Sequence, residues 1–229
     1  MKYIKEFENH AAYEAAESGL ILPNVSLCVN ENEVHYNPYV DPYAGHAYVD
    51  LGLPSGTKWA TMNVGATSET EYGNYYQYGK GAAQYAATSG DSNYSGTEDP
   101  LDSSVDTAVQ VWGGSWHMPT SVQMEELTAN TTYQWTTING VNGGKFTSKT
   151  DSFNYIFLPA AGYWFDNDFN DDGVFGFYWS SSPNGSNHAY SLTFGNGNYK
   201  DVYTYLRKYG YSVRPVVGWE FILTTTYKG

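Results

Sequence analysis

The stretch FGFYWSSSPNGSNHAYSLTF, residues 175–194, decides the fold of this chain. Two runs rich in aromatic residues flank the turn-forming residues PNGSN, a pattern that predicts an antiparallel β-hairpin. Short apolar runs of the same kind lie on both sides of it, from FNYIFLPAAGYW at residue 153 to YGYSVRPVV and EFILTTTY near the C-terminus. Gly195-Asn196-Gly197 predicts a further hairpin turn. The C-terminal part is therefore predicted to be a set of short antiparallel strands.

A helix is predicted ahead of these strands, in MPTSVQMEELTAN. Thr120 can cap it, Gln123 occupies the capping-box position, and Met124 and Leu127 would face the interior. Residues 79–106 are polar and poor in aliphatic side chains, which predicts an exposed irregular insertion. The expected fold class is α+β, with short antiparallel strands, few helices and much irregular loop.

The N-terminal residues form a separate segment. Residues 3–18 place apolar side chains three or four apart, which predicts an amphipathic helix. Val25–Val29 and Val34–Tyr36 predict a hairpin, and the linker NPYVDPYAGH follows. We therefore expect domains at 1–45 and 46–229. A helix plus a hairpin is too small to be stable alone, so residues 1–45 should pack on the main domain or on a partner.

Composition excludes several classes of protein. With a net charge of −13, the chain lacks the basic face that nucleic acids or anionic membranes require. No apolar run is long enough to cross a bilayer, and the charged start lacks the apolar core of a secretory signal peptide. Cys28 is the only cysteine, which rules out an internal disulfide.

The sequence shows no catalytic pattern, and we expect no enzyme. The five histidines are scattered, and Glu125 and Glu126 are adjacent on the predicted helix, so their carboxylates point in different directions. DFNDDG resembles the opening of a calcium loop, with oxygen ligands at Asp168, Asn170 and Asp172. Its twelfth position is Trp179 instead of a carboxylate, and an acidic surface loop is the alternative.

Tyrosine is the most informative residue type in the chain. There are 23 tyrosines, and Tyr199, Tyr203 and Tyr205 stand at alternate positions, so that on a strand they share one face. Rigid amphipathic rings among Asn, Ser and Asp are typical of antibody-like binding surfaces. The alternative is an aromatic ladder that holds a hairpin together.

Five motifs along the chain together resemble those of a known group of proteins. They are YVDLGLPSGTKWATMNVGA (48–66), WHMPTSVQMEEL (116–127), FLPAAGY (157–163), YWSSSPNGSNHAYSLTF (178–194) and GYSVRPV (210–216). The set resembles the variable proteins of diversity-generating retroelements of gut phages and bacteria. These proteins have a C-type-lectin-like fold related to formylglycine-generating enzymes. The resemblance covers about residues 46–217 and implies that fold for them.

The resemblance also implies a hypervariable region at about residues 163–211, with Trp179 and Arg214 in the fixed scaffold. Asn184, Asn187, Asn196 and Asn198 fit a template rich in Asn codons. The ligand-binding residues implied in this region are Trp164, Phe177, His188, Tyr190, Tyr199, Asp201, Tyr203 and Tyr205. Formylglycine generation needs a pair of cysteines that this chain lacks, so that activity is not expected.

The function implied is receptor binding in host attachment, at the tip of a phage tail fibre in the virion. The partner would be a protein or glycan of the target cell surface. Residues 1–45, which are similar to end segments of virion proteins, would attach to other virion proteins or form a homo-oligomer, as in trimeric relatives. The alternatives are a bacterial adhesin or lectin of fixed specificity at the cell surface, and a degenerate enzyme with a pocket near His117 or His188.

Overall fold

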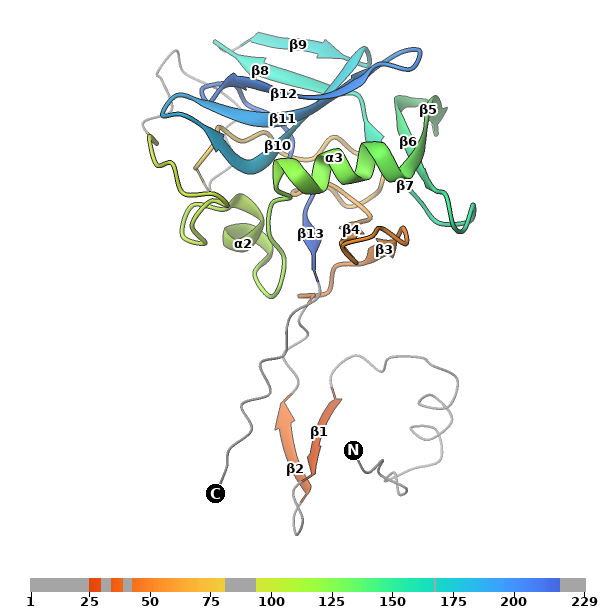
Figure 1. The fold of residues 1–229 in the computed structure, drawn as a ribbon, viewed down its shortest axis with the longest axis vertical. Coiled ribbons are helices and arrows are strands. Elements are labelled where there is room, and N and C mark those ends of the chain that lie inside the picture. Colours follow the sequence, from red (N-terminus) through yellow and green to blue (C-terminus); the bar gives the residue numbers. More distant parts are fainter. Residues whose placement is uncertain (1–24, 30–33, 39–42, 81–93, 167, 219–229) are drawn as a thin grey trace. The chain divides into compact units, whose positions relative to one another are not determined.

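The computed structural model describes residues 25–29, 34–38, 43–80, 94–166 and 168–218. The chain divides into two compact units, residues 1–45 and 46–229. In the first, β1 (Val25–Val29) pairs antiparallel with β2 (Val34–Pro38), which confirms the predicted hairpin (Figure 1). The helix predicted at residues 3–18 lies outside the described residues, as does the run EFILTTTY.

The second unit is mostly antiparallel β-sheet with two helices in its described part, in agreement with the predicted α+β class. Its elements are β3 (Tyr48–Asp50), β4 (Lys58–Ala60), α2 (Thr107–Trp112), α3 (Ser121–Asn130), β5 (Thr131–Ile138), β6 (Val141–Ser148), β7 (Tyr155–Pro159), β8 (Ala161–Phe165), β9 (Asp168–Asp172), β10 (Phe175–Asn184), β11 (His188–Gly195), β12 (Lys200–Leu206) and β13 (Val216–Val217).

Three sheets organise these strands. The largest has the order β12-β11-β10-β8-β9, in which β10 and β8 are parallel and the other neighbours antiparallel. The other two have the orders β13-β4-β3 and β5-β6-β7. In Figure 1 the five-stranded sheet lies at the top of this unit, and α3 runs beneath it.

Helix α3 has the predicted start. The Thr120 side chain accepts a hydrogen bond from the Gln123 backbone N–H, and the Gln123 side chain accepts one from the Thr120 N–H, which is a complete capping box. Met124 and Leu127 are fully buried in the same apolar cluster as Leu192 of β11. The helix therefore covers one face of the five-stranded sheet.

A buried arginine joins the sheets. Arg214 is fully buried and donates from Nε to Asn63 Oδ1 (2.8 Å), from one terminal nitrogen to Ala60 O (3.0 Å) and from the other to Phe157 O (3.0 Å). Trp179, also fully buried, donates its indole N–H to Tyr76 O (2.9 Å). Both residues therefore have the structural role expected of scaffold.

The insertion predicted at residues 79–106 is irregular in its described part, but it is not exposed throughout. Leu101 and Asp106 are buried. The Asp106 carboxylate caps α2, a helix that the sequence did not predict, by accepting from the N–H groups of Ala108 and Val109. It also accepts from the Met118 N–H at 2.9 Å. The correction follows from capping, since a buried carboxylate needs such donors.

Candidate functional site

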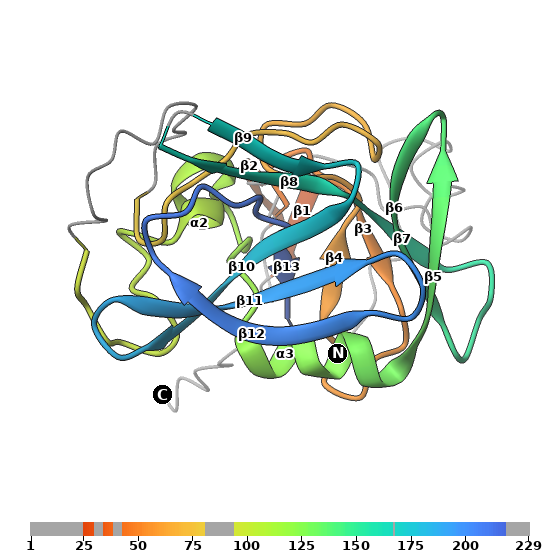
Figure 2. The ribbon, with the colours of Figure 1, turned by 90° about the horizontal axis from the view of Figure 1, so that it is seen from above.

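Strand register decides which side chains share the face of the five-stranded sheet opposite α3. Residues directly opposite in an antiparallel pair point to the same side, and neighbours along a strand point to opposite sides. Figure 2 shows β10, β11 and β12 side by side from above. The register pairs Asp201 with Thr193, Tyr203 with Ser191, Tyr205 with Ala189, and Phe177 with Thr193. Phe177, Asp201, Tyr203 and Tyr205 therefore lie on one face, opposite α3.

The rings on this face form a continuous chain of contacts from the core to the surface. Trp179 stacks on Tyr211, with ring centroids 4.3 Å apart. Tyr211 contacts Phe177 at 5.1 Å, Phe177 contacts Tyr205 at 5.8 Å, and Tyr205 contacts Tyr203 at 5.9 Å. These separations lie in the range in which aromatic pairs stabilise one another. The outer tyrosines are thus held in place by the buried rings beneath them.

Contacts with further rings extend this line of aromatic residues into a surface. Tyr163 of β8 contacts Phe177 at 5.2 Å and Tyr209 at 5.5 Å. Phe175 contacts Phe177 at 6.2 Å and Tyr199 at 6.2 Å. We call the resulting surface the aromatic face: Tyr163, Phe175, Phe177, Tyr199, Tyr203, Tyr205 and Tyr209.

Exposure increases outward across the aromatic face. Tyr211 beneath it is 2% exposed and Phe177 is 7% exposed, whereas Tyr199 is 46% and Tyr203 is 60% exposed. Burial raises the pKa of the Tyr211 hydroxyl well above its ordinary value, and it raises the pKa of Tyr199 as well. These tyrosines are therefore neutral near pH 7, with hydroxyls that can both donate and accept hydrogen bonds.

A groove runs along this face. It has a volume of about 490 Å³ and is lined by Asp171, Val174, Phe175, Phe177, Thr193, Asn196, Tyr199 and Tyr205. Its walls are aromatic, and the polar atoms of Asp171, Thr193 and Asn196 are interspersed among the rings. Apolar walls with a few polar groups are characteristic of ligand sites. The groove is too open to exclude water, which suits binding better than catalysis.

Not every implied ligand-binding residue lies here. His188 and Tyr190 alternate with Ala189 and Ser191, so they lie on the face toward α3. His188 instead contacts Asn187 Oδ1 through Nδ1 (2.7 Å). These two residues therefore do not lie on the aromatic face, and the sequence could not indicate this because it does not reveal the register.

Trp164 is also separate from the aromatic face. Its neighbour Tyr163 contacts Phe177, so Trp164 points to the other side of β8, where it stacks on Phe169 (5.3 Å) and meets Tyr75 edge-on (6.5 Å). The sequence selected Trp164, whereas Tyr163 is the residue of β8 that lies on the aromatic face. It also missed Phe175 and Tyr209. Strand alternation from Phe177 would have indicated Phe175.

The residues proposed for calcium form a strand instead of a loop. Asp168, Asn170 and Asp172 lie on β9, paired with β8. Positions four apart on a strand are separated by about 13 Å, too far for one ion to bind both carboxylates. Within the described residues no group of three His, Cys, Asp or Glu side chains could hold a metal. The loop expectation was wrong, and the calcium interpretation loses the geometry on which it rested.

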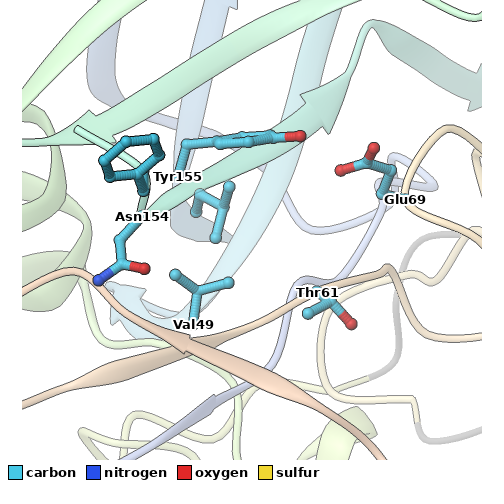
Figure 3. A pocket seen from close by; sticks show the side chains of 7 residues that line it. Val49, Thr61, Glu69, Asn154 and Tyr155 are labelled. Carbon is cyan, nitrogen blue, oxygen red and sulfur yellow. The ribbon is translucent and has the colours of Figure 1, made fainter. Parts of the chain in front are cut away.

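Two other cavities lie away from the aromatic face. One of about 250 Å³ is lined by Val49 and Thr61 on one side and Asn154 and Tyr155 on the other, with Glu69 its single carboxylate (Figure 3). Its remaining lining residues, Phe153 and Ile156, are apolar.

The other cavity, of about 430 Å³, includes Asp106 and His117. Burial raises the pKa of the Asp106 carboxyl, which its hydrogen bonds to backbone N–H groups partly offset. His117 Nδ1 lies 3.1 Å from Met118 O. Because Asp106 caps α2 and also accepts from Met118 N–H, its perturbed pKa is explained by its structural role.

Truncating the inner and the outer tyrosine should have different effects. Tyr205→Ala removes the ring that contacts Phe177, Tyr203 and Tyr211, and should lower the free energy of unfolding by about 1.5–3 kcal/mol. Tyr203→Ala removes an outer ring and should change it by about 0.5 kcal/mol or less. Urea unfolding of both variants measures the difference. Equal losses would show that the contact chain does not anchor the face.

Comparison with known proteins gives little further guidance. Residues 120–216 match a family described as a domain of unknown function (DUF8237). This range contains α3, the five-stranded sheet and Arg214. No curated protein matches the chain. No solved structure matches it either. No helix in the part of the chain that the structure describes has the length and apolarity to cross a membrane.

Proposed function

We propose that the chain is a non-enzymatic binding protein that uses the aromatic face to recognise a target on a cell surface. The observation that carries the proposal is the graded contact chain from buried Trp179 to exposed Tyr203. Because the outer rings pack on rigid buried rings, they lose less conformational entropy on binding. Tyrosine supplies a large contact area with few rotatable bonds.

The same proposal includes the fold of the domain and the kind of protein to which the chain belongs. The domain is C-type-lectin-like and resembles the variable proteins of diversity-generating retroelements. All seven residues of the aromatic face fall within the implied variable region, 163–211. Arg214, which joins the sheets, falls outside it. A surface that varies on a fixed scaffold needs this separation of roles.

The biological setting we propose is host attachment by a phage tail fibre. Residues 1–45, a separate compact unit, would link the binding domain to other virion proteins or to further copies of itself. Several copies would raise avidity without any new contact at each site. This arrangement suits a monovalent site that is shallow and open.

The proposal is tested by binding to intact cells. The fluorescently labelled chain is screened against a panel of gut bacteria by flow cytometry, and a strain that binds is used to compare variants. Tyr199→Ala combined with Tyr203→Ala should weaken binding at least about tenfold, since exposed aromatic anchors dominate such interfaces. The melting temperature is measured in parallel to show that the fold is retained.

Val122→Ala is the matched control. Val122 is 69% exposed on α3, the helix that covers the opposite side of the sheet, so its loss should leave binding unchanged. Binding that survives the double tyrosine substitution, or that falls equally with Val122→Ala, would contradict the proposal.

A further inference from the structure

The groove on the aromatic face has a one-sided charge. Asp171 is among its lining residues, and none of the eight lining residues is a lysine, arginine or histidine. Asp201 lies on the same face of β12 and is exposed. After burial, the negative charge of Asp171 is a further cause of the raised pKa of Tyr163, and that of Asp201 contributes to the raised pKa of Tyr199. The part of the aromatic face that lines the groove therefore has carboxylates beside it, whereas the cation Lys208 lies over Phe165 near Tyr209.

A second observation points to a missing hydrogen-bond partner. Thr193 lines the groove and is 2% exposed, and its Oγ1 is buried without a hydrogen-bond partner among the described residues. A buried hydroxyl left unpaired is unfavourable, by about 1–3 kcal/mol. This oxygen has almost no accessible surface, so a donor on a ligand in the groove would reach it only if the Thr193 side chain turned to another rotamer.

Aromatic walls, a carboxylate and an unpaired hydroxyl together favour one kind of ligand group. A guanidinium carries five N–H donors in a plane and no acceptor. It stacks on aromatic rings, is attracted to their faces by its charge, and is more weakly hydrated than an ammonium. A sugar hydroxyl can donate a charge-assisted hydrogen bond to Asp171, but it brings no positive charge to pair with the carboxylate. The groove is therefore better suited to a cation than to a glycan.

We infer that the groove receives an arginine side chain from a protein on the target surface. The guanidinium would pack on the ring of Tyr205, beside Phe177, and pair with Asp171. The inference rests on the proposed function, because it specifies the partner class of the same face.

The test uses small probes and the full chain. N-acetyl-arginine amide is titrated while the backbone amide signals are followed by NMR, and N-acetyl-citrulline amide serves as the neutral isostere. The arginine derivative should shift the amides of Asp171, Phe177, Thr193 and Tyr205, with an affinity at least about fivefold above that of the citrulline derivative. Methyl mannoside is titrated as a glycan probe.

Matched charge variants locate the effect. Asp171→Asn should reduce the preference for arginine to about one, and it should preserve the fold, because Asp171 has a φ of 58° and asparagine tolerates that conformation. Glu125→Gln removes the same charge from an exposed position on α3 and should leave the preference unchanged. Melting temperatures of both variants establish that they are folded.

Three outcomes would overturn the inference: equal binding of the two amides, a preference that Asp171→Asn does not change, or shifts at the groove from the mannoside alone. The absence of any shift at the groove would overturn it as well. Cell binding that still depends on Tyr199 and Tyr203 would then show that the proposed function stands without a cationic partner. Loss of that dependence would show that both are wrong.

Discussion

Raising the pH above about 10 should unfold this protein. The hydroxyls of four buried tyrosines donate to backbone carbonyls: Tyr75 to Ala161, Tyr78 to Ser181, Tyr133 to Gly195 and Tyr178 to Pro159. Burial raises the pKa of all four, that of Tyr133 to about 12 and those of the others further. These hydroxyls stay protonated in the folded chain when they would ionise in the unfolded one.

The direction in which pH changes the free energy of unfolding follows from proton binding. Above about pH 10 the unfolded chain has lost tyrosine protons that the folded chain retains, so each further rise in pH favours unfolding. Each such tyrosine lowers the free energy of unfolding by up to about 1.4 kcal/mol per pH unit, until the pH reaches its folded pKa. Four of them acting together exceed the stability of a typical domain within about two pH units.

Urea unfolding at several pH values between about 8 and 12 measures the effect, with tyrosinate absorbance as an independent record of ionisation. The variant Tyr75→Phe removes one of the protons and should flatten the decline by about one fifth, since Tyr211, whose pKa is also raised by burial, contributes as well. Stability that stays constant up to about pH 12 would contradict the neutral, buried state of these side chains.

Replacement of Arg214 by methionine should lower the free energy of unfolding by about 3–5 kcal/mol. The substitution leaves Asn63 Oδ1, Ala60 O and Phe157 O without their donor in a fully buried site, and each unsatisfied acceptor is costly. The loss would separate elements that the chain brings together from positions far apart in sequence. Urea unfolding, or the soluble yield if the variant does not fold, measures the effect.

Two further variants serve as comparisons for Arg214→Met. Arg214→Lys keeps the charge but cannot reach three acceptors with one nitrogen, so its loss should be intermediate. Lys149→Met removes an exposed cation that donates to Ala129 O and should change stability by less than about 1 kcal/mol. A loss below about 1 kcal/mol for Arg214→Met would show that the buried network does not hold the sheets together.

The sequence predicted features that depend on neighbouring residues. The capping box of Thr120 and Gln123 is local chemistry, and so is the turn after Gly195. Alternation placed Tyr203 and Tyr205 on one side of a strand, since that needs only one strand. These predictions were confirmed because nothing distant could override them.

Features that depend on register or on distant contacts were missed. His188 and Tyr190 resemble the other binding residues in type, but their side of the sheet is fixed by pairing with β12. Arg207 was not singled out by the sequence, although it is buried and donates to carbonyls of Tyr94, Gly96, Gly185 and His188. Its partners are backbone carbonyls and the rings of Tyr78 and Tyr94, all distant in sequence or without charge, so no acidic neighbour indicates its burial.

The central claim is that the aromatic face is a diversified binding surface, and the DNA around the gene tests it most directly. The claim predicts a near-copy of codons 163–216 beside a reverse-transcriptase gene, differing from this sequence only at adenines. The differing codons should encode residues of the aromatic face, such as Tyr163, Tyr199, Tyr203 and Tyr205. They should spare the core-facing Leu192, which is fully buried beside α3. The absence of a copy, or differences concentrated at core-facing positions, would contradict the claim.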